Sequence, residues 1–137
     1  MKTLFAAAMV ASLAAPALAD EAWVSNAGTV IYLEDVGTTA VLQQFHPRYG
    51  ELRVYVPGLG GNYDDRVGLF AGYWIAVDPS RADWSCDVSV VMEDGHVSNV
   101  WGRVNIEFMT TGFPSGFDGF TGSCHDEADV RWTANPS

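Results

Sequence analysis

The stretch that decides the fold class is WSCDVSVVMEDGHVSNVWGRVNIEF, from Trp84 to Phe108, because apolar and polar residues alternate in both of its halves. A period of two is typical of half-buried strands. Between the halves lies Asp94-Gly95, which supplies the positive-φ residue that a tight turn requires. The stretch therefore predicts a long antiparallel hairpin in which residues 84–92 pair with residues 97–108.

The faces of this hairpin constrain its register, because a one-residue slip moves every side chain to the opposite face of the sheet. A two-residue loop at Asp94-Gly95 would place Arg103 among apolar side chains. A three-residue connection from Asp94 to His96 instead pairs Val90 with Val100 and keeps the faces consistent. We therefore expect the second register.

The first 19 residues have the pattern of a secretory signal peptide. Lys2 is the short positive region, residues 4–15 form an apolar run that is too short to span a membrane, and Ala17-Leu18-Ala19 is a small-residue cleavage pattern. We expect cleavage after Ala19, which leaves residues 20–137 as a single β-barrel domain in the periplasm or outside the cell.

The mature chain is strongly acidic. Lys2 leaves with the leader, so six arginines face seventeen acidic residues, a formal charge of −11. A nucleic-acid partner is excluded on this basis, because phosphate binding needs clustered basic residues. Solubility of an exported protein is the simplest explanation, although a basic partner or a cationic ligand is also compatible.

The two cysteines, Cys86 and Cys124, are expected to form a disulfide in an oxidising compartment. No histidine lies near them at the spacing of a zinc site. The bond would close a loop of nearly forty residues, which corresponds to about 4 kcal/mol in the chain-entropy treatment.

Further strand patterns predict an all-β fold without helices. They cover residues 22–24, 28–33, 38–45, 51–56, 67–77 and, as a short closing strand, 128–133. Short connections between consecutive strands favour a small antiparallel up-and-down barrel of six to eight strands, with a two-sheet sandwich as the alternative. Residues 57–65 and 112–122 are expected to be glycine-rich loops.

The strand predicted from Val67 to Val77 is apolar on both faces, and such strands are covered on both faces. In a one-sheet barrel this indicates either a subunit interface, and hence a homo-oligomer, or a lid over the outer face.

Catalytic and metal-binding motifs are absent from the sequence. It contains no nucleophile-elbow serine, no phosphate-binding loop and no zincin histidine pair, so we do not expect an enzyme and we expect no cofactor. A hydrolytic enzyme is the third candidate, because an acid–base pair such as Glu107 with an aspartate can form between residues far apart in sequence. The segment from His125 to Asp129 carries clustered carboxylates that would suit a divalent cation, but its spacing matches no EF-hand loop and a solvated polar turn is the preferred interpretation. We expect no catalytic residue and no metal site.

The aromatic residues give the strongest functional signal. Trp101 shares the polar side of its strand with Asn99 and Arg103, and aromatic walls with a few placed polar groups are typical of small-ligand pockets. In the expected register, Trp84 and Trp101 cannot both face one barrel interior, so at least one of them should face outward or toward a partner.

Two short motifs resemble the avidin and streptavidin family. Trp23, followed after four residues by Gly28-Thr29 and an apolar alternation, is similar to the first strand of that family, and Trp84, the Asp94-Gly95 turn and Trp101 resemble a later hairpin. The resemblance implies a β-barrel in which Thr29 stands where a hydroxyl holds the biotin ureido oxygen, with Trp84 and Trp101 as pocket walls. Ser25 stands where the family has asparagine, and the Tyr-x-Ser pair of its second hairpin is not reproduced.

Together these features predict an exported, non-catalytic binding protein with an aromatic-lined pocket or surface for a small ligand. The expected ligand-binding residues are Thr29, Trp84, Asn99, Trp101 and Arg103. The alternative is a structural or interaction protein, or an inhibitor of the bacterial envelope, that acts through an apolar β surface.

Overall fold

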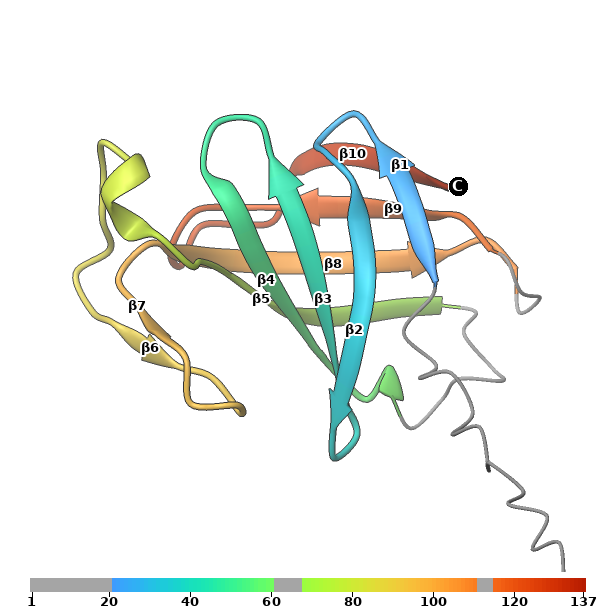
Figure 1. Ribbon diagram of the computed structural model, residues 1–137, viewed down its shortest axis with the longest axis horizontal. Helices are drawn as coiled ribbons and strands as arrows, with labels where there is room; N and C mark the ends of the chain where they lie inside the picture. Colours follow the sequence, from blue (N-terminus) through green and yellow to red (C-terminus); the bar gives the residue numbers. More distant parts are fainter. Residues whose placement is uncertain (1–20, 61–67, 111–114) are drawn as a thin grey trace, which may run out of the picture.

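The computed structural model describes residues 21–60, 68–110 and 115–137 (Figure 1). The predicted signal peptide lies outside the described residues, as do parts of the two predicted glycine-rich loops. No α-helix occurs among the described residues, and none of their helices is long and apolar enough to cross a membrane.

Eight antiparallel strands close into a barrel, as the sequence predicts. They are β1 (Ala22–Ser25), β2 (Val30–Val36), β3 (Thr39–His46), β4 (Gly50–Pro57), β5 (Gly68–Ala76), β8 (Trp101–Phe108), β9 (Phe117–Thr121) and β10 (Val130–Pro136). Each strand pairs with the next barrel strand along the chain, and β10 closes the ring against β1. This is the up-and-down order, so the sandwich alternative does not apply.

The long hairpin predicted for residues 84–108 is wrong. Only β6 (Val90–Val91) and β7 (Val97–Ser98) pair within it, with Val90 opposite Ser98 rather than Val100. Residues 84–89 form no strand. The reason is that β8 already has two partners, since β5 and β9 occupy its two edges in the closed barrel. Gly95 does take the expected positive φ, 90°.

The prediction of a loop over residues 112–122 is also wrong in part, because β9 occupies Phe117–Thr121. Its two faces are not distinguished by hydrophobicity, since Phe117 and Phe120 fall on opposite faces and Gly119 has no side chain. Packing requires glycine at position 119, because a Cβ there would lie 2.2 Å from Cε2 of Trp132, the residue paired with Gly119 on β10.

The barrel interior holds the main apolar core. Alternate residues of the strands point into it, among them Trp23 on β1, Leu42 on β3, Val54 on β4, Ile106 on β8 and Phe117 on β9, each no more than 1 % exposed. Trp23 also fixes the connection that leads into β9, because its Nε1 donates to the carbonyl oxygen of Ser115 at 2.8 Å.

A second apolar cluster lies on the outer wall. Val41, Tyr55, Ile75 and Trp101 point outward from adjacent strands and are nevertheless buried. They are covered by residues 77–100, here called the covering segment, which runs from β5 to β8 and contributes Cys86 and Met92 to the cluster. The segment includes the 3₁₀-helix η2 (Pro79–Arg81), β6 and β7, and lies outside the barrel (Figure 1).

The covering segment buries the outward face of β5 at the C-terminal end of the strand, which explains why that end is apolar on both faces. Ile75 is 1 % exposed beneath it, which matches the lid expected over the outer face. The rest of that outward face is uncovered, because Leu69 is 61 % exposed and Tyr73 is 41 % exposed.

The disulfide between Cys86 and Cys124 is confirmed. It joins the covering segment to the connection between β9 and β10. The backbone N–H of Cys124 also donates to the carbonyl oxygen of Trp101 at 2.8 Å, so this connection is fixed to the outer wall by both covalent and hydrogen bonds.

Candidate binding site at the barrel mouth

Four connections meet at one end of the barrel, here called the mouth. They are the turn after β1, the turn between β3 and β4, the start of the covering segment and the β9–β10 connection, as follows from the alternating strand directions. A cavity of about 690 Å³ opens there, and its lining comes from three of these connections and the strand ends beside them. This volume falls in the range of small-ligand pockets.

One wall of the cavity is aromatic. Tyr49 of the β3–β4 turn stacks on Trp74 of β5, with ring centroids 6.0 Å apart and an interplanar angle of 16°. Trp84 of the covering segment supports both from behind, because its ring meets each of them edge-on and its Nε1 donates to the Tyr49 hydroxyl oxygen at 3.1 Å. The wall is therefore held in place by its own contacts.

A second wall is the β9–β10 connection, residues 122–129. Nε1 of Trp74 donates to the carbonyl oxygen of Gly122 at 2.9 Å, and the N–H of Gly122 donates to Arg103 O at 3.0 Å. This close approach requires Gly102, since a Cβ there would lie 1.8 Å from Gly122 O. The disulfide at Cys124 fixes the same connection, so both walls are set by the fold.

Leu52 of β4 and Trp132 of β10 extend the lining into the barrel. Trp132 is only 4 % exposed, and its ring packs at 5.5 Å from that of Phe117. Its Nε1 is buried and has no hydrogen-bond acceptor among the residues that the structure describes.

The charged side chains of the cavity lie at its rim. Asp126, Glu127 and Asp129 are exposed on the β9–β10 connection, whereas Arg131 is paired with Asp118 at 3.0 Å. Burial, followed by the nearby positive charge of Arg48, lowers the pKa of His46 on the other side of the rim. The lining therefore carries three carboxylates against two arginines, Arg48 and Arg131, and is net acidic when His46 is neutral.

Within the described part of the chain, no three His, Cys, Asp or Glu side chains converge as metal ligands. This applies to the segment from His125 to Asp129, in which His125 instead packs edge-on against Trp101 at 4.9 Å.

The structure does not bring the five sequence-predicted binding residues together. Trp84 supports the cavity wall from behind, and Trp101 is buried on the outer wall, where its Nε1 donates to Val88 O at 2.8 Å. Thr29, Asn99 and Arg103 are exposed and none of them lines the mouth cavity. One expectation is confirmed: Trp84 and Trp101 do not share one interior.

The sequence interpretation missed Tyr49, Trp74 and Trp132. Trp74 lies in the predicted strand 67–77, which is apolar on both faces, and Tyr49 lies between the predicted strands 38–45 and 51–56. For Trp132, the available signal was the alternation along β10, in which Trp132 and Ala134 are buried and the residues between and beside them are exposed. This pattern places Trp132 on the inward face of the barrel.

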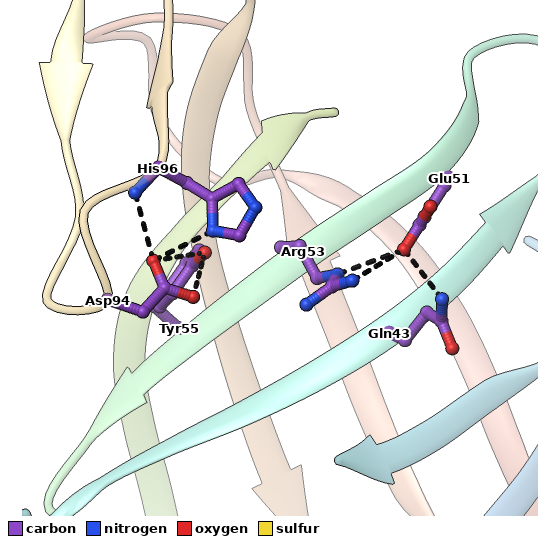
Figure 2. Close-up of polar contacts among 6 residues, drawn as sticks. All are labelled: Gln43, Glu51, Arg53, Tyr55, Asp94 and His96. Carbon is purple, nitrogen blue, oxygen red and sulfur yellow. Dashed lines mark hydrogen bonds and ion pairs between the residues drawn. The ribbon is translucent and has the colours of Figure 1, made fainter. Parts of the chain in front are cut away.

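A polar cluster on the outer wall fastens the covering segment. The Tyr55 hydroxyl on β4 donates to both carboxylate oxygens of Asp94, at 2.9 and 2.8 Å, and Nδ1 of His96 lies 3.0 Å from the same carboxylate (Figure 2). Burial and the Asp94 carboxylate raise the pKa of Tyr55. Burial acts to raise the pKa of Asp94, but the hydrogen bonds from His96 and Tyr55 outweigh it and hold that pKa below its ordinary value.

Gln43, Glu51 and Arg53 form a neighbouring network on β3 and β4 (Figure 2), in which Gln43 and Arg53 both donate to the Glu51 carboxylate, Gln43 at 2.6 Å. In both networks the polar side chains hydrogen-bond to one another on a barrel wall, as expected of side chains that stabilise the fold. The mouth cavity is the better candidate for a ligand site.

No protein-family model, curated protein or solved structure matches this chain. The resemblance to the avidin family therefore stays a prediction.

Proposed function

We propose that the mature protein is an exported, non-catalytic binding protein that holds a small ligand in the mouth cavity. One observation carries the proposal: a cavity of about 690 Å³ has an aromatic wall of Tyr49 and Trp74 that is fixed by other parts of the fold. The lining combines this aromatic wall with polar and charged side chains at the rim, and small-ligand sites are usually preformed, with aromatic walls and polar groups that orient the ligand.

Export is part of the proposal. The disulfide between Cys86 and Cys124 fits an oxidising compartment, and the predicted leader would deliver the chain there. A small carrier released into such a compartment needs a rigid site, because rigidity reduces the entropy lost on binding.

Native mass spectrometry of protein purified without refolding tests the proposal. We expect a retained small-molecule adduct in the wild type. The adduct should be lost in Ala27→Trp, which fills the cavity from the β1–β2 turn, and kept in Ala71→Trp, which places the same side chain on the exposed face of β5.

Tryptophan fluorescence titration with a broad panel of small molecules complements this measurement, and biotin belongs in the panel because of the avidin resemblance. A wild-type spectrum without an adduct, together with no fluorescence response across the panel, would refute a ligand-binding function.

The second candidate function is an interaction protein that acts through an apolar β surface. It is favoured by the exposure of Leu69 (61 %) and Tyr73 (41 %) on β5, and of Val91 (70 %) and Val97 (59 %) on the covering segment. The same native spectrum separates the two: a dimer that Leu69→Ser dissociates, without an adduct, would favour this candidate.

A further inference from the structure

The five tryptophans of the chain differ in one respect. Four of them donate their indole N–H to an oxygen of the protein: Trp23 to Ser115, Trp74 to Gly122, Trp84 to Tyr49 and Trp101 to Val88. Trp132 does not, since its Nε1 has no acceptor among the described residues. A buried donor without an acceptor costs about 1–3 kcal/mol, and native proteins retain few of them.

Trp132 is also a lining residue of the mouth cavity. A molecule bound in the cavity is therefore well placed to supply the missing acceptor. The nitrogen atom itself is covered by its neighbours, so a contact with a bound acceptor requires the surrounding wall to move and uncover it.

The charges at the rim select the kind of acceptor. Three carboxylates line the cavity, those of Asp126, Glu127 and Asp129. Arg48 and Arg131 are the lining arginines, and Arg131 is engaged by Asp118, so negative charge is in excess. A carboxylate or phosphate entering past this lining would be repelled, and the formal charge of −11 on the mature chain adds to that repulsion. A neutral oxygen meets no such barrier.

From these observations we propose that the cavity takes an uncharged, ring-bearing molecule whose carbonyl-type oxygen accepts a hydrogen bond from Nε1 of Trp132. This inference rests on the proposed binding function and names the ligand class for the same site. The ring packs against the aromatic wall, and the indole N–H fixes its orientation.

Three probes of nearly equal shape test the ligand class: benzamide is neutral with a carbonyl oxygen, benzoate is an anionic acceptor, and benzamidine is a cation without an acceptor oxygen. Their binding is followed by NMR of the ¹⁵N-labelled mature protein through its five tryptophan indole signals. We expect benzamide to bind most tightly and to move the Trp132 signal downfield, the direction caused by a new hydrogen bond.

Trp132→Phe assigns that signal and removes the N–H. We expect it to weaken benzamide binding about fivefold, the effect of one lost hydrogen bond. Trp101→Phe is the matched control, because it removes an indole N–H from the outer wall and should leave the affinity unchanged. Replacement of Trp132 by benzothienylalanine keeps the bicyclic ring without the N–H, and it should reproduce the fivefold loss.

The outcomes separate the two proposals. An adduct in the native spectrum, combined with benzoate or benzamidine binding as tightly as benzamide or with full benzamide affinity in the benzothienylalanine variant, would overturn the ligand class and leave the binding function standing. Absence of an adduct and of any probe-induced shift at Trp74 or Trp132 would overturn both.

Discussion

At the scale of single residues, the cavity depends on glycines that let parts of the chain approach closely. Gly102 on β8 lies under the carbonyl of Gly122, and an added Cβ would come within 1.8 Å of that oxygen and 2.5 Å of Nε1 of Trp74. Both atoms belong to the cavity walls. The absence of one methyl group therefore determines where the β9–β10 connection lies.

We predict that Gly102→Ala displaces this connection and breaks the hydrogen bond from Trp74 to Gly122. The loss of unfolding free energy should be about 1–3 kcal/mol, as for other overpacked sites, and is measured by urea denaturation. Gly37→Ala is the control, because its Cβ meets open space and carries only the strain of a φ of 62°, about 1–2 kcal/mol.

The two variants differ most clearly in ligand retention. Gly102→Ala should lose the native adduct, whereas Gly37→Ala, in the turn at the opposite end of the barrel, should keep it. Equal retention in both would show that the connection does not depend on Gly102.

At the scale of elements, the covering segment is held to the barrel at few points. Its strands β6 and β7 pair only with each other, over two residue pairs, and neither pairs with a barrel strand. Apart from the hydrogen bonds that Trp84 and Trp101 make, the segment is fastened by the disulfide at Cys86, the packing of Met92 and the hydrogen bonds between Asp94 and Tyr55. We expect such a segment to open more readily than the barrel strands.

We predict that Asp94→Ala loosens the β6–β7 part of the segment. It leaves the buried Tyr55 hydroxyl without its acceptor, which costs about 1–3 kcal/mol. Hydrogen exchange should quicken at the amide of Met92, which is bonded to His96 O at 2.8 Å, but not in β3 or β4. Asp87→Ala, an exposed carboxylate in the same segment, should change neither.

The same contact has a pH dependence of defined sign. The folded-state pKa of Asp94 is lowered, so its stabilising contribution is complete above the ordinary aspartate value of about 3.9 and is lost as pH falls through the lower folded value. The chemical shift of the His96 amide, which donates to Asp94 at 3.1 Å, reports this titration. A midpoint at or above the ordinary value would contradict the assignment.

At the scale of the whole molecule, the disulfide joins the covering segment to one wall of the cavity, across 38 residues of sequence. Because it closes a long loop, it lowers the conformational entropy of the unfolded chain, which stabilises the fold by about 4 kcal/mol in the chain-entropy treatment. It also limits the movement of residues 122–129 in the folded state.

We predict that the double variant Cys86→Ser, Cys124→Ser unfolds at lower urea concentration by about 4 kcal/mol of unfolding free energy. Ligand affinity should fall as well, because one cavity wall is freed. Reduced wild-type protein should behave in the same way, which controls for the serine substitutions. Unchanged affinity in both would mean that hydrogen bonds alone, such as that from Cys124 N–H to Trp101 O, fix the wall.

The sequence by itself determined the all-β class, the up-and-down barrel and the disulfide, because alternating hydrophobicity, short turns and the presence of two cysteines are local features. It also indicated that the outer face of β5 is covered, by a partner subunit or by a lid, since Ile75 is as apolar as its inward neighbours, but it did not choose between the two.

Only the tertiary structure decided which strands are neighbours. Residues 84–92 alternate as a strand would, yet β8 is paired on both sides by β5 and β9, and ring closure is a property of all eight strands together. For the same reason the cavity residues could not be predicted: Tyr49, Trp74 and Trp132 are far apart in sequence and meet only because the closed barrel brings their strand ends to one mouth.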